Sequence, residues 1–227
     1  MNKVLFWDFD GTLVYSQSLW TGSVYNALLN HIKDTDITIE DIRPYMRTGF
    51  TWHSYDSDHT SFIERAWWEQ LEKHFCSIFT TFGIDEKTAE NISKDVRDII
   101  LDVSKYNLYE DTILALQGAL DKGYCNYIIS NNYPELDQTL EKLNLDKYFK
   151  DYIISGKIGY DKPRKEIFES ALKMSGKPDK CFMIGDNPIA DITGAKNMGI
   201  PAILVHRDAI SNADYKFDNL KDILNVI

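Results

Sequence analysis

Short apolar runs recur along the chain, and they are the feature that most limits how it can fold. The runs are Val4–Trp7, Tyr127–Ser130, Tyr152–Ile154, Cys181–Gly185 and Ala202–Val205. Each shows little polar alternation, which is typical of a strand buried on both faces of a parallel sheet. We therefore expect a parallel sheet covered by helices on both sides, which is an α/β fold.

Stretches with helical periodicity separate the later runs. Residues Thr112 to Lys122 place Ile113, Leu116 and Leu120 on one face, and Gly123 follows as a helix stop. Similar patterns cover Pro134–Leu143, Arg164–Met174 and Ala190–Met198. The repeated order of strand and helix predicts a doubly wound, Rossmann-like sheet.

The segment from Tyr15 to Lys105 does not follow this alternation. It contains no buried-strand run, but Ser61–Phe82 and Lys87–Val103 have helical spacing. A connection between the first strand and the next element normally takes a handful of residues, whereas roughly 90 intervene here. We expect an inserted, all-helical cap domain at 15–105 and a catalytic core made of 1–14 and 106–227.

The overall charge narrows the range of partners. The chain has 25 basic and 35 acidic residues, a formal net charge of −10. Nucleic acids and anionic membranes are bound mainly through Lys and Arg, so we expect neither as a partner. The 3 cysteines form no close pair, and no run approaches the length of a membrane span. These patterns predict a cytoplasmic protein that is a monomer or a small homo-oligomer.

Two acidic residues follow the first strand directly. The sequence Asp8-Phe9-Asp10-Gly11-Thr12 places both carboxylates at the carboxyl edge of the sheet, where open α/β folds bind ligands. The structural alternative is a helix N-cap, for which Asp is also favoured.

Three further polar groups follow successive strands. They are Ser130-Asn131-Asn132, Lys162-Pro163 and Gly185-Asp186-Asn187, the last with Asp191 shortly after it. Each is common in purely structural roles, as a turn or as the start of a helix. Their order, each at the end of a strand, indicates that they meet at one edge of the sheet.

The motifs DFDGT, Ser130-Asn131, Lys162 in GYDKP and GDNPIAD resemble those of the haloacid dehalogenase superfamily. The stretch SGKIGYDKPRKEIFESAL is similar to the phosphatase subfamily that inserts a helical cap after the first strand. The resemblance implies strand order 5-4-1-2-3 in the core. It also implies hydrolysis of a phosphomonoester through an aspartyl phosphate on Asp8, with Mg²⁺ as cofactor.

The same resemblance implies a role for each motif residue. The Mg²⁺ ligands would be the Asp8 carboxylate, the Asp10 main-chain carbonyl and the Asp186 carboxylate, which suit a hard cation. Asp191 would orient Lys162 or a water on the metal, or would itself be a ligand. The phosphoryl group would be held by Lys162, Ser130, Asn131, Gly11 and Thr12.

The second aspartate of the first motif indicates the reaction class. An acid at Asp10 can protonate a departing alkoxide, and the dehalogenases of the superfamily lack it. We therefore expect a phosphatase acting on a small phosphorylated metabolite. A phosphosugar mutase shares the same core and stays open as an alternative, as does a catalytically silent regulator that binds a phosphorylated ligand.

The substrate-selecting residues are harder to identify. The stretch Arg43–Thr60 is the expected loop over the leaving group, and within it Arg47 and His53 are candidates for contacting the substrate. The alternative is that both are solvated loop residues. Trp67 and Trp68 are neighbours on a helix, so we expect one in the interior of the cap and the other exposed or in the cleft between cap and core.

Overall fold

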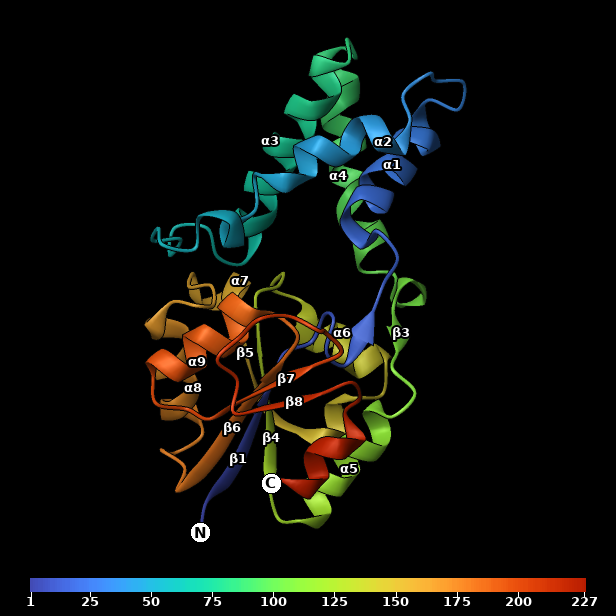
Figure 1. The fold of residues 1–227 in the computed structure, drawn as a ribbon. Coiled ribbons are helices and arrows are strands. Elements are labelled where there is room, and N and C mark those ends of the chain that lie inside the picture. The colour runs from blue at the N-terminus through green and yellow to red at the C-terminus, as the bar shows by residue number, and fades with distance from the viewer.

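A computed structural model describes all 227 residues. Its central sheet has the order β5-β4-β1-β6-β7-β8, and every pair in it is parallel. The strands are β1 (Lys3–Trp7), β4 (Cys125–Ser130), β5 (Phe149–Ile154), β6 (Lys180–Gly185), β7 (Ala202–Val205) and β8 (Tyr215–Phe217). Read from β7 to β5, this is the predicted order 5-4-1-2-3, so the predicted α/β fold is confirmed (Figure 1).

Side chains of the central strand enter two separate hydrophobic clusters. In β1, Leu5 and Trp7 pack on one face of the sheet and Val4 and Phe6 on the other, because successive residues of a strand point to opposite faces. The first face is covered by α5 (Thr112–Asp121) and α6 (Leu136–Lys142), and the second by α8 (Lys165–Met174) and α9 (Gly194–Asn197). This two-sided burial is why the strands lack polar alternation.

Several elements have no clear signal in the sequence. β8 extends the sheet beyond the predicted edge, and the predicted helix at 190–198 divides into a π-helical segment, Pro188–Thr193, and α9. The four-residue α7 (Ser155–Ile158) follows β5. β2 (Val14–Tyr15) and β3 (Asn107–Leu108) form a separate antiparallel pair at the two points where the chain leaves and re-enters the core.

The helices between β2 and β3 form a second body above the sheet, which we call the cap (Figure 1). They are α1 (Leu19–His31), α2 (Ile39–Ile42), α3 (Arg65–Thr81) and α4 (Glu86–Ile100). α4 packs against both α1 and α3. The predicted helices at 61–82 and 87–103 correspond to α3 and α4, whereas α1 and α2 were not predicted.

The cap touches the core away from the β2–β3 pair. Trp67 and Trp68 are both buried, the first among cap residues and the second against Tyr133 of the core. Trp68 Nε1 also donates a hydrogen bond to Glu135 at 2.8 Å. Trp68 therefore lies at the cap–core boundary, one of the two expected places.

A loop of the cap is held on the core by main-chain hydrogen bonds. The amide of His59 donates to the carbonyl of Gly159 at 3.2 Å, and that of Glu64 to Gly156 at 2.8 Å. None of the helices combines the length and the continuous apolar surface that a membrane-spanning helix needs.

Candidate active site

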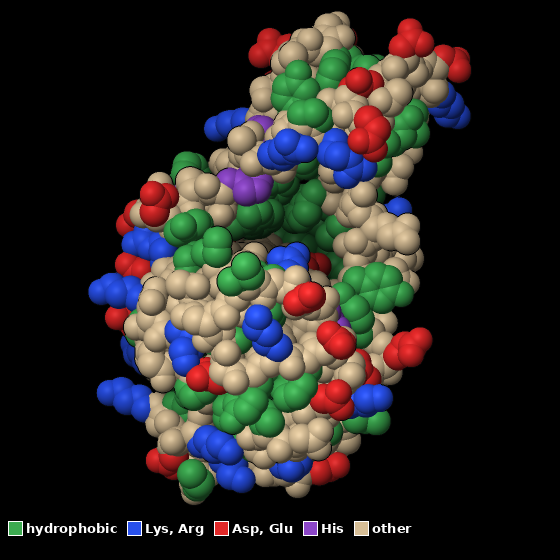
Figure 2. Space-filling model, in the orientation of Figure 1, with side chains coloured by type: hydrophobic (Ala, Val, Ile, Leu, Met, Phe, Trp, Pro, Cys, Tyr) green, Lys and Arg blue, Asp and Glu red, His purple; other side chains and the backbone are tan.

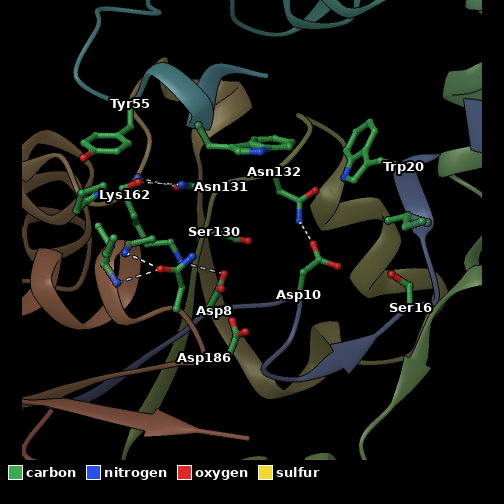
Figure 3. A pocket seen from close by; sticks show the side chains of 16 residues that line it. Asp8, Asp10, Ser16, Trp20, Tyr55, Ser130, Asn131, Asn132, Lys162 and Asp186 are labelled. Carbon is green, nitrogen blue, oxygen red and sulfur yellow. Dashed lines mark hydrogen bonds and ion pairs between the residues drawn. The ribbon is translucent and has the colours of Figure 1, made fainter. Parts of the chain in front are cut away.

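A cavity of about 460 Å³ lies between the cap and the carboxyl ends of β1, β4 and β6. In Figure 2 the hollow between the two bodies is open to solvent, with hydrophobic side chains on its inner wall. Its floor contains Asp8, Asp10, Ser130, Lys162 and Asp186 (Figure 3). The carboxyl edge of the sheet therefore brings together residues from all four motifs, which are far apart in the sequence.

Asp8 is fixed by its place at the end of the central strand. Its amide donates to the carbonyl of Ile184 at 2.9 Å, which continues the β1–β6 ladder by one residue. Its side chain is 12% exposed, and Oδ1 lies 2.8 Å from Lys162 Nζ. The carboxylate is thus oriented by a cation while part of it remains accessible from the cavity.

Lys162 is a buried cation held between two carboxylates. Its Nζ lies 2.6 Å from Asp191 Oδ1, besides its contact with Asp8. Burial acts to lower its pKa, but the carboxylates of Asp191 and Asp8 raise the pKa of Lys162 above its ordinary value. Lys162 therefore keeps its proton and supplies fixed positive charge at the floor of the cavity.

The main chain at Lys162 is tied to the end of β4 by Asn131. The Asn131 side chain accepts a hydrogen bond from the Lys162 amide at 2.6 Å and donates to its carbonyl at 2.9 Å. Ser130 precedes it, is 1% exposed overall and lines the cavity. The side chain of Asn131 is thus engaged with protein, so its contribution to ligand binding would come from its backbone.

Asp10 lies across the cavity from Lys162 (Figure 3). Its Oδ2 accepts a hydrogen bond from Asn132 Nδ2 at 2.6 Å, and Asn132 Oδ1 in turn accepts from the Tyr133 amide. Burial, together with the charge of Asp8, raises the pKa of Asp10 to about 7, although Asn132 opposes the shift. A carboxyl with such a pKa can both donate and accept a proton near neutrality.

Asn132 was expected at this strand end together with Ser130 and Asn131, but no role was assigned to it from the sequence. Its position directly after Ser130-Asn131 was the available signal, because it extends the same strand end by one residue. Its amide fixes the orientation of the Asp10 carboxyl, and we treat it as a positioning residue.

Asp186 follows β6 and approaches the Asp8 loop closely. Gly11 permits this approach: its φ is +77°, and a Cβ there would lie 2.7 Å from Asp186 Cγ. Thr12 is buried beside it and does not line the cavity. The half-exposed Arg207 lies 3.3 Å from Asp186 Oδ2, a contact without any sequence signal.

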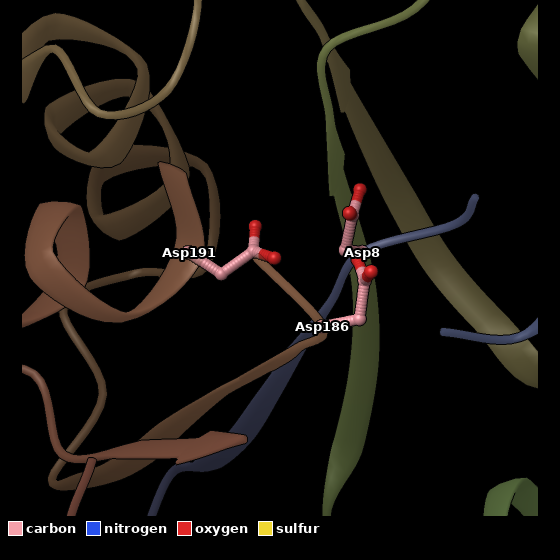
Figure 4. A group of neighbouring side chains, drawn as sticks. All are labelled: Asp8, Asp186 and Asp191. Carbon is pink, nitrogen blue, oxygen red and sulfur yellow. The ribbon is translucent and has the colours of Figure 1, made fainter. Parts of the chain in front are cut away.

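Asp8, Asp186 and Asp191 form one acidic cluster (Figure 4). One carboxylate oxygen from each lies within 4.8 Å of the others. Burial and the Asp8 charge raise the pKa of Asp186 to about 6, and the same two causes raise the pKa of Asp191 against the opposing effect of Lys162. The cluster therefore holds more negative charge than its lysine neutralises.

The donor set fits a hard divalent cation. Carboxylate oxygens are preferred ligands of Mg²⁺, and excess negative charge favours a cation over a neutral ligand. Asp191 is the least available member, because Oδ1 contacts Lys162 and Oδ2 accepts from the Asn187 amide at 2.9 Å. Asp8 and Asp186 are the carboxylates that could hold the ion.

The cap wall of the cavity differs from the prediction. Neither Arg47 nor His53 lines it: Arg47 is exposed, and the His53 ring packs edge-on against Phe50 at 5.5 Å. The residues that line this wall are Ser16, Leu19, Trp20, Trp52 and Tyr55. Aromatic members of the expected loop thus border the cavity in place of its basic members.

Known proteins match this chain over most of its length. The family model described as haloacid dehalogenase-like hydrolase matches residues 2–199. A glyceraldehyde 3-phosphate phosphatase of Methanothermobacter thermautotrophicus is 26% identical over 92% of this chain and 87% of its own length. A phosphoserine phosphatase of Thermus thermophilus is 31% identical, and the match covers 52% of this chain and 51% of that protein.

Solved structures agree in fold. The HAD-hydrolase YfnB of Bacillus subtilis, solved bound to magnesium, superposes with a TM-score of 0.74 at 19% identity, covering 99% of this chain and 98% of that one. A HAD phosphatase from Thermococcus onnurineus gives 0.65 at 24% identity, covering 99% and 97%. With four motifs gathered at one sheet edge and a family match over residues 2–199, the chain belongs to the haloacid dehalogenase-like hydrolases.

Proposed function

We propose that the protein is a Mg²⁺-dependent phosphatase that transfers the phosphoryl group of a small phosphomonoester to Asp8 and then to water. The observation that carries the proposal is the arrangement on the cavity floor. A carboxylate oriented by a buried lysine lies opposite a carboxyl that is oriented by an amide. Phosphatases among the relatives support the reaction class.

Asp8 is the proposed nucleophile. Lys162 contacts Oδ1 of its carboxylate at 2.8 Å, and the other oxygen, Oδ2, would attack phosphorus. Lys162, the Ser130 hydroxyl and the backbone near Asn131 would bind the phosphoryl oxygens and stabilise their growing charge. A bound Mg²⁺, held by the carboxylates of Asp8 and Asp186 and the Asp10 carbonyl, would offset the repulsion between two anions.

Asp10 is the proposed acid and base. In its protonated form it would donate to the oxygen of the departing alcohol, and it would then take a proton from the water that attacks the phosphorylated Asp8. Asn132 holds the carboxyl toward the cavity for both steps. Asp191 would act through Lys162, because the protein already engages both of its oxygens.

We further propose that the cap is a separate domain that closes over this floor. The chain passes between the core and the cap twice, once at β2 and once at β3. These two strands pair there, with Val14 opposite Leu108 and Tyr15 opposite Asn107, and this pair is the proposed hinge. Closure would remove water from the reacting groups.

The test is phosphate release from p-nitrophenyl phosphate and glycerol 3-phosphate, with Mg²⁺ and with EDTA. We expect release with the metal, loss with EDTA, and loss by a factor on the order of 10⁴ or more in Asp8→Asn. Asp36→Asn, an exposed cap aspartate, is the matched control and should behave as the wild type. Full activity of Asp8→Asn would refute the proposed nucleophile.

A further inference from the structure

The cap wall of the cavity carries aromatic rings and no charged group. Trp20 comes from α1, and Trp52 and Tyr55 come from the short helical segment Thr51–Ser54 and the residue after it. Trp20 and Tyr55 lie on opposite sides of the opening above Asp8 (Figure 3). A leaving group attached to a phosphoryl group at Asp8 would extend between these rings.

The two indoles are held in place by other rings. Phe50, which is buried, stacks on Trp52 with ring centres 4.5 Å apart and planes at 16°. Trp20 meets Phe50 edge-on at 4.8 Å and lies 5.8 Å from Trp52. Rings fixed in this way lose little conformational entropy when they bind a flat ligand, so they form a preorganised surface.

The charges around the cavity disfavour an anionic leaving group. Lys162 is the only cation that lines it, and Asp8 and Asp191 already contact its amine. Arg207 contacts Asp186 but does not line the cavity. A carboxylate or a second phosphate on the leaving group would therefore face Asp10 and Asp186 without a cationic partner.

The cap wall also offers few groups for a bare sugar. The amides of Asn131 and Asn132 make hydrogen bonds within the protein, and the Asn187 oxygen accepts from the amides of Ile189 and Ala190. On the cap wall itself, the hydroxyl groups are those of Ser16 and Tyr55, and the other polar side-chain groups are the single N–H donors of Trp20 and Trp52. A polyol would lose hydrogen bonds to water on entry, whereas a flat ring would gain contact with the indoles.

We propose that this site takes esters whose leaving group is uncharged and ends in a flat heteroaromatic ring, that is, nucleoside 5′-monophosphates. The base would stack on Trp20 or Trp52 with Tyr55 at its edge, and the phosphoryl group would reach Asp8. The cavity volume, about 460 Å³, lies within the usual range for small-molecule sites. This inference rests on the proposed phosphatase activity.

The sharpest comparison is between uridine 5′-monophosphate and ribose 5-phosphate, because they differ by the base. Adenosine 5′-monophosphate, acetyl phosphate and phosphoglycolate complete the set. We expect kcat/KM for at least one nucleotide to exceed that for ribose 5-phosphate by roughly tenfold or more, since stacking of one base is worth about 5- to 150-fold. Phosphoglycolate should be the poorest of the set. Uridine alone should inhibit acetyl phosphate hydrolysis competitively.

Two variants assign the effect to the rings. Tyr55→Ala and Trp52→Leu should each lower the nucleotide-to-ribose-phosphate ratio, by roughly fivefold or more. Phe62→Ala is the matched control, because Phe62 and Tyr55 are each 39% exposed and Phe62 does not line the cavity. It should keep the wild-type ratio. Should Trp52→Leu fail to fold, the exposed Tyr55 still provides the test.

The two proposals fail in different ways. Release of phosphate from acetyl phosphate and ribose 5-phosphate as readily as from both nucleotides would overturn the proposed base-binding site of Trp20, Trp52 and Tyr55 (the ring site). It would leave the proposed phosphatase activity standing. A preference for phosphoglycolate would also overturn the ring site. No release from any of these esters with Mg²⁺ would overturn the phosphatase and the ring site together.

Discussion

The floor of the cavity and its cap wall, which forms the roof over that floor, are built in different ways. On the floor, Ser130 ends a parallel strand, and Asp8 and Asp186 each directly follow one. The sheet therefore sets the positions of all three. On the roof, Trp20 and Trp52 are set by packing against Phe50 and other rings of the cap. The floor is charged and polar, whereas the roof is mostly apolar. This difference suggests that the floor determines the reaction and the roof the choice of substrate.

After the nucleophile itself, the largest effect should come from the buried cation of the floor. Lys162→Met removes the partner of Asp8 and Asp191, so we expect kcat to fall by about 10³. The free energy of unfolding should also fall by roughly 3 kcal/mol, because two buried carboxylates lose their counter-charge. Steady-state kinetics and urea unfolding measure the two effects. Lys165→Met, at a position whose side chain is 68% exposed, is the control. A wild-type kcat in Lys162→Met would contradict the proposed role of the charged floor in catalysis.

The next effect separates the proposed acid from the nucleophile. Asp10→Asn should lower kcat for glycerol 3-phosphate by about 10² to 10³, because the alkoxide leaves without a proton. For p-nitrophenyl phosphate the loss should be clearly smaller, because that leaving group departs as a stable anion. Kinetics on both esters give the ratio. Equal losses on the two substrates would contradict the role of Asp10 in protonating the leaving group.

A smaller effect, on thermal stability, should come from Asp161, which lies between the core and the cap beside Ser155 and Thr51. Asp161 is buried, and burial raises the pKa of its carboxyl, so the folded protein binds that proton more tightly than the unfolded chain. Its stabilising contribution is therefore present at low pH and is lost as the pH rises through the raised pKa. Asp161→Asn, which stays neutral, should raise Tm at pH 7 by about 2 °C and show no gain near pH 4.

Thermal unfolding followed by circular dichroism across this pH range measures the difference between the two proteins. A gain in Tm that is the same at pH 4 and pH 7 would show that titration of Asp161 is not its cause.

The smallest effect should come from the basic residues of the cap. Arg47 and His53 lie outside the cavity, so Arg47→Ala and His53→Ala should leave kcat/KM for every ester within about twofold of the wild type. The same assays used for Tyr55→Ala provide the comparison. A loss beyond tenfold in Arg47→Ala would mean that the cap moves far enough during turnover to bring this side chain to the substrate.

The core could be predicted from the sequence to a large extent. Strands such as Val4–Trp7 are buried on both faces, so their apolar runs are visible, and a parallel sheet places the residues after them at one edge. The role of Asn132 could not be predicted, because it depends on the turn of its side chain toward Asp10, which no spacing reveals. β8 was missed because it is short and exposed on average, without an apolar run.

The roof could not be predicted in the same way. The loop around Trp52 and His53 contains basic and aromatic side chains in close sequence, and which of them face the cavity depends on how the loop folds. Phe50 packs against both kinds of side chain: it stacks on Trp52, which lines the cavity, and meets His53, which does not, edge-on. The expectation for Trp67 and Trp68 came closer, because adjacent helical positions must face different directions.

The proposed mechanism requires that Asp8 carries the phosphoryl group during turnover. The most direct measurement is to quench the reacting enzyme with acid, reduce any acyl phosphate with borohydride, and locate the reduced residue by peptide mass spectrometry. We expect position 8 to be reduced in the wild-type protein turning over substrate with Mg²⁺, and to be unmodified without substrate. Phosphate release without reduction at position 8, or with reduction at another carboxylate such as Asp186, would contradict the proposed mechanism.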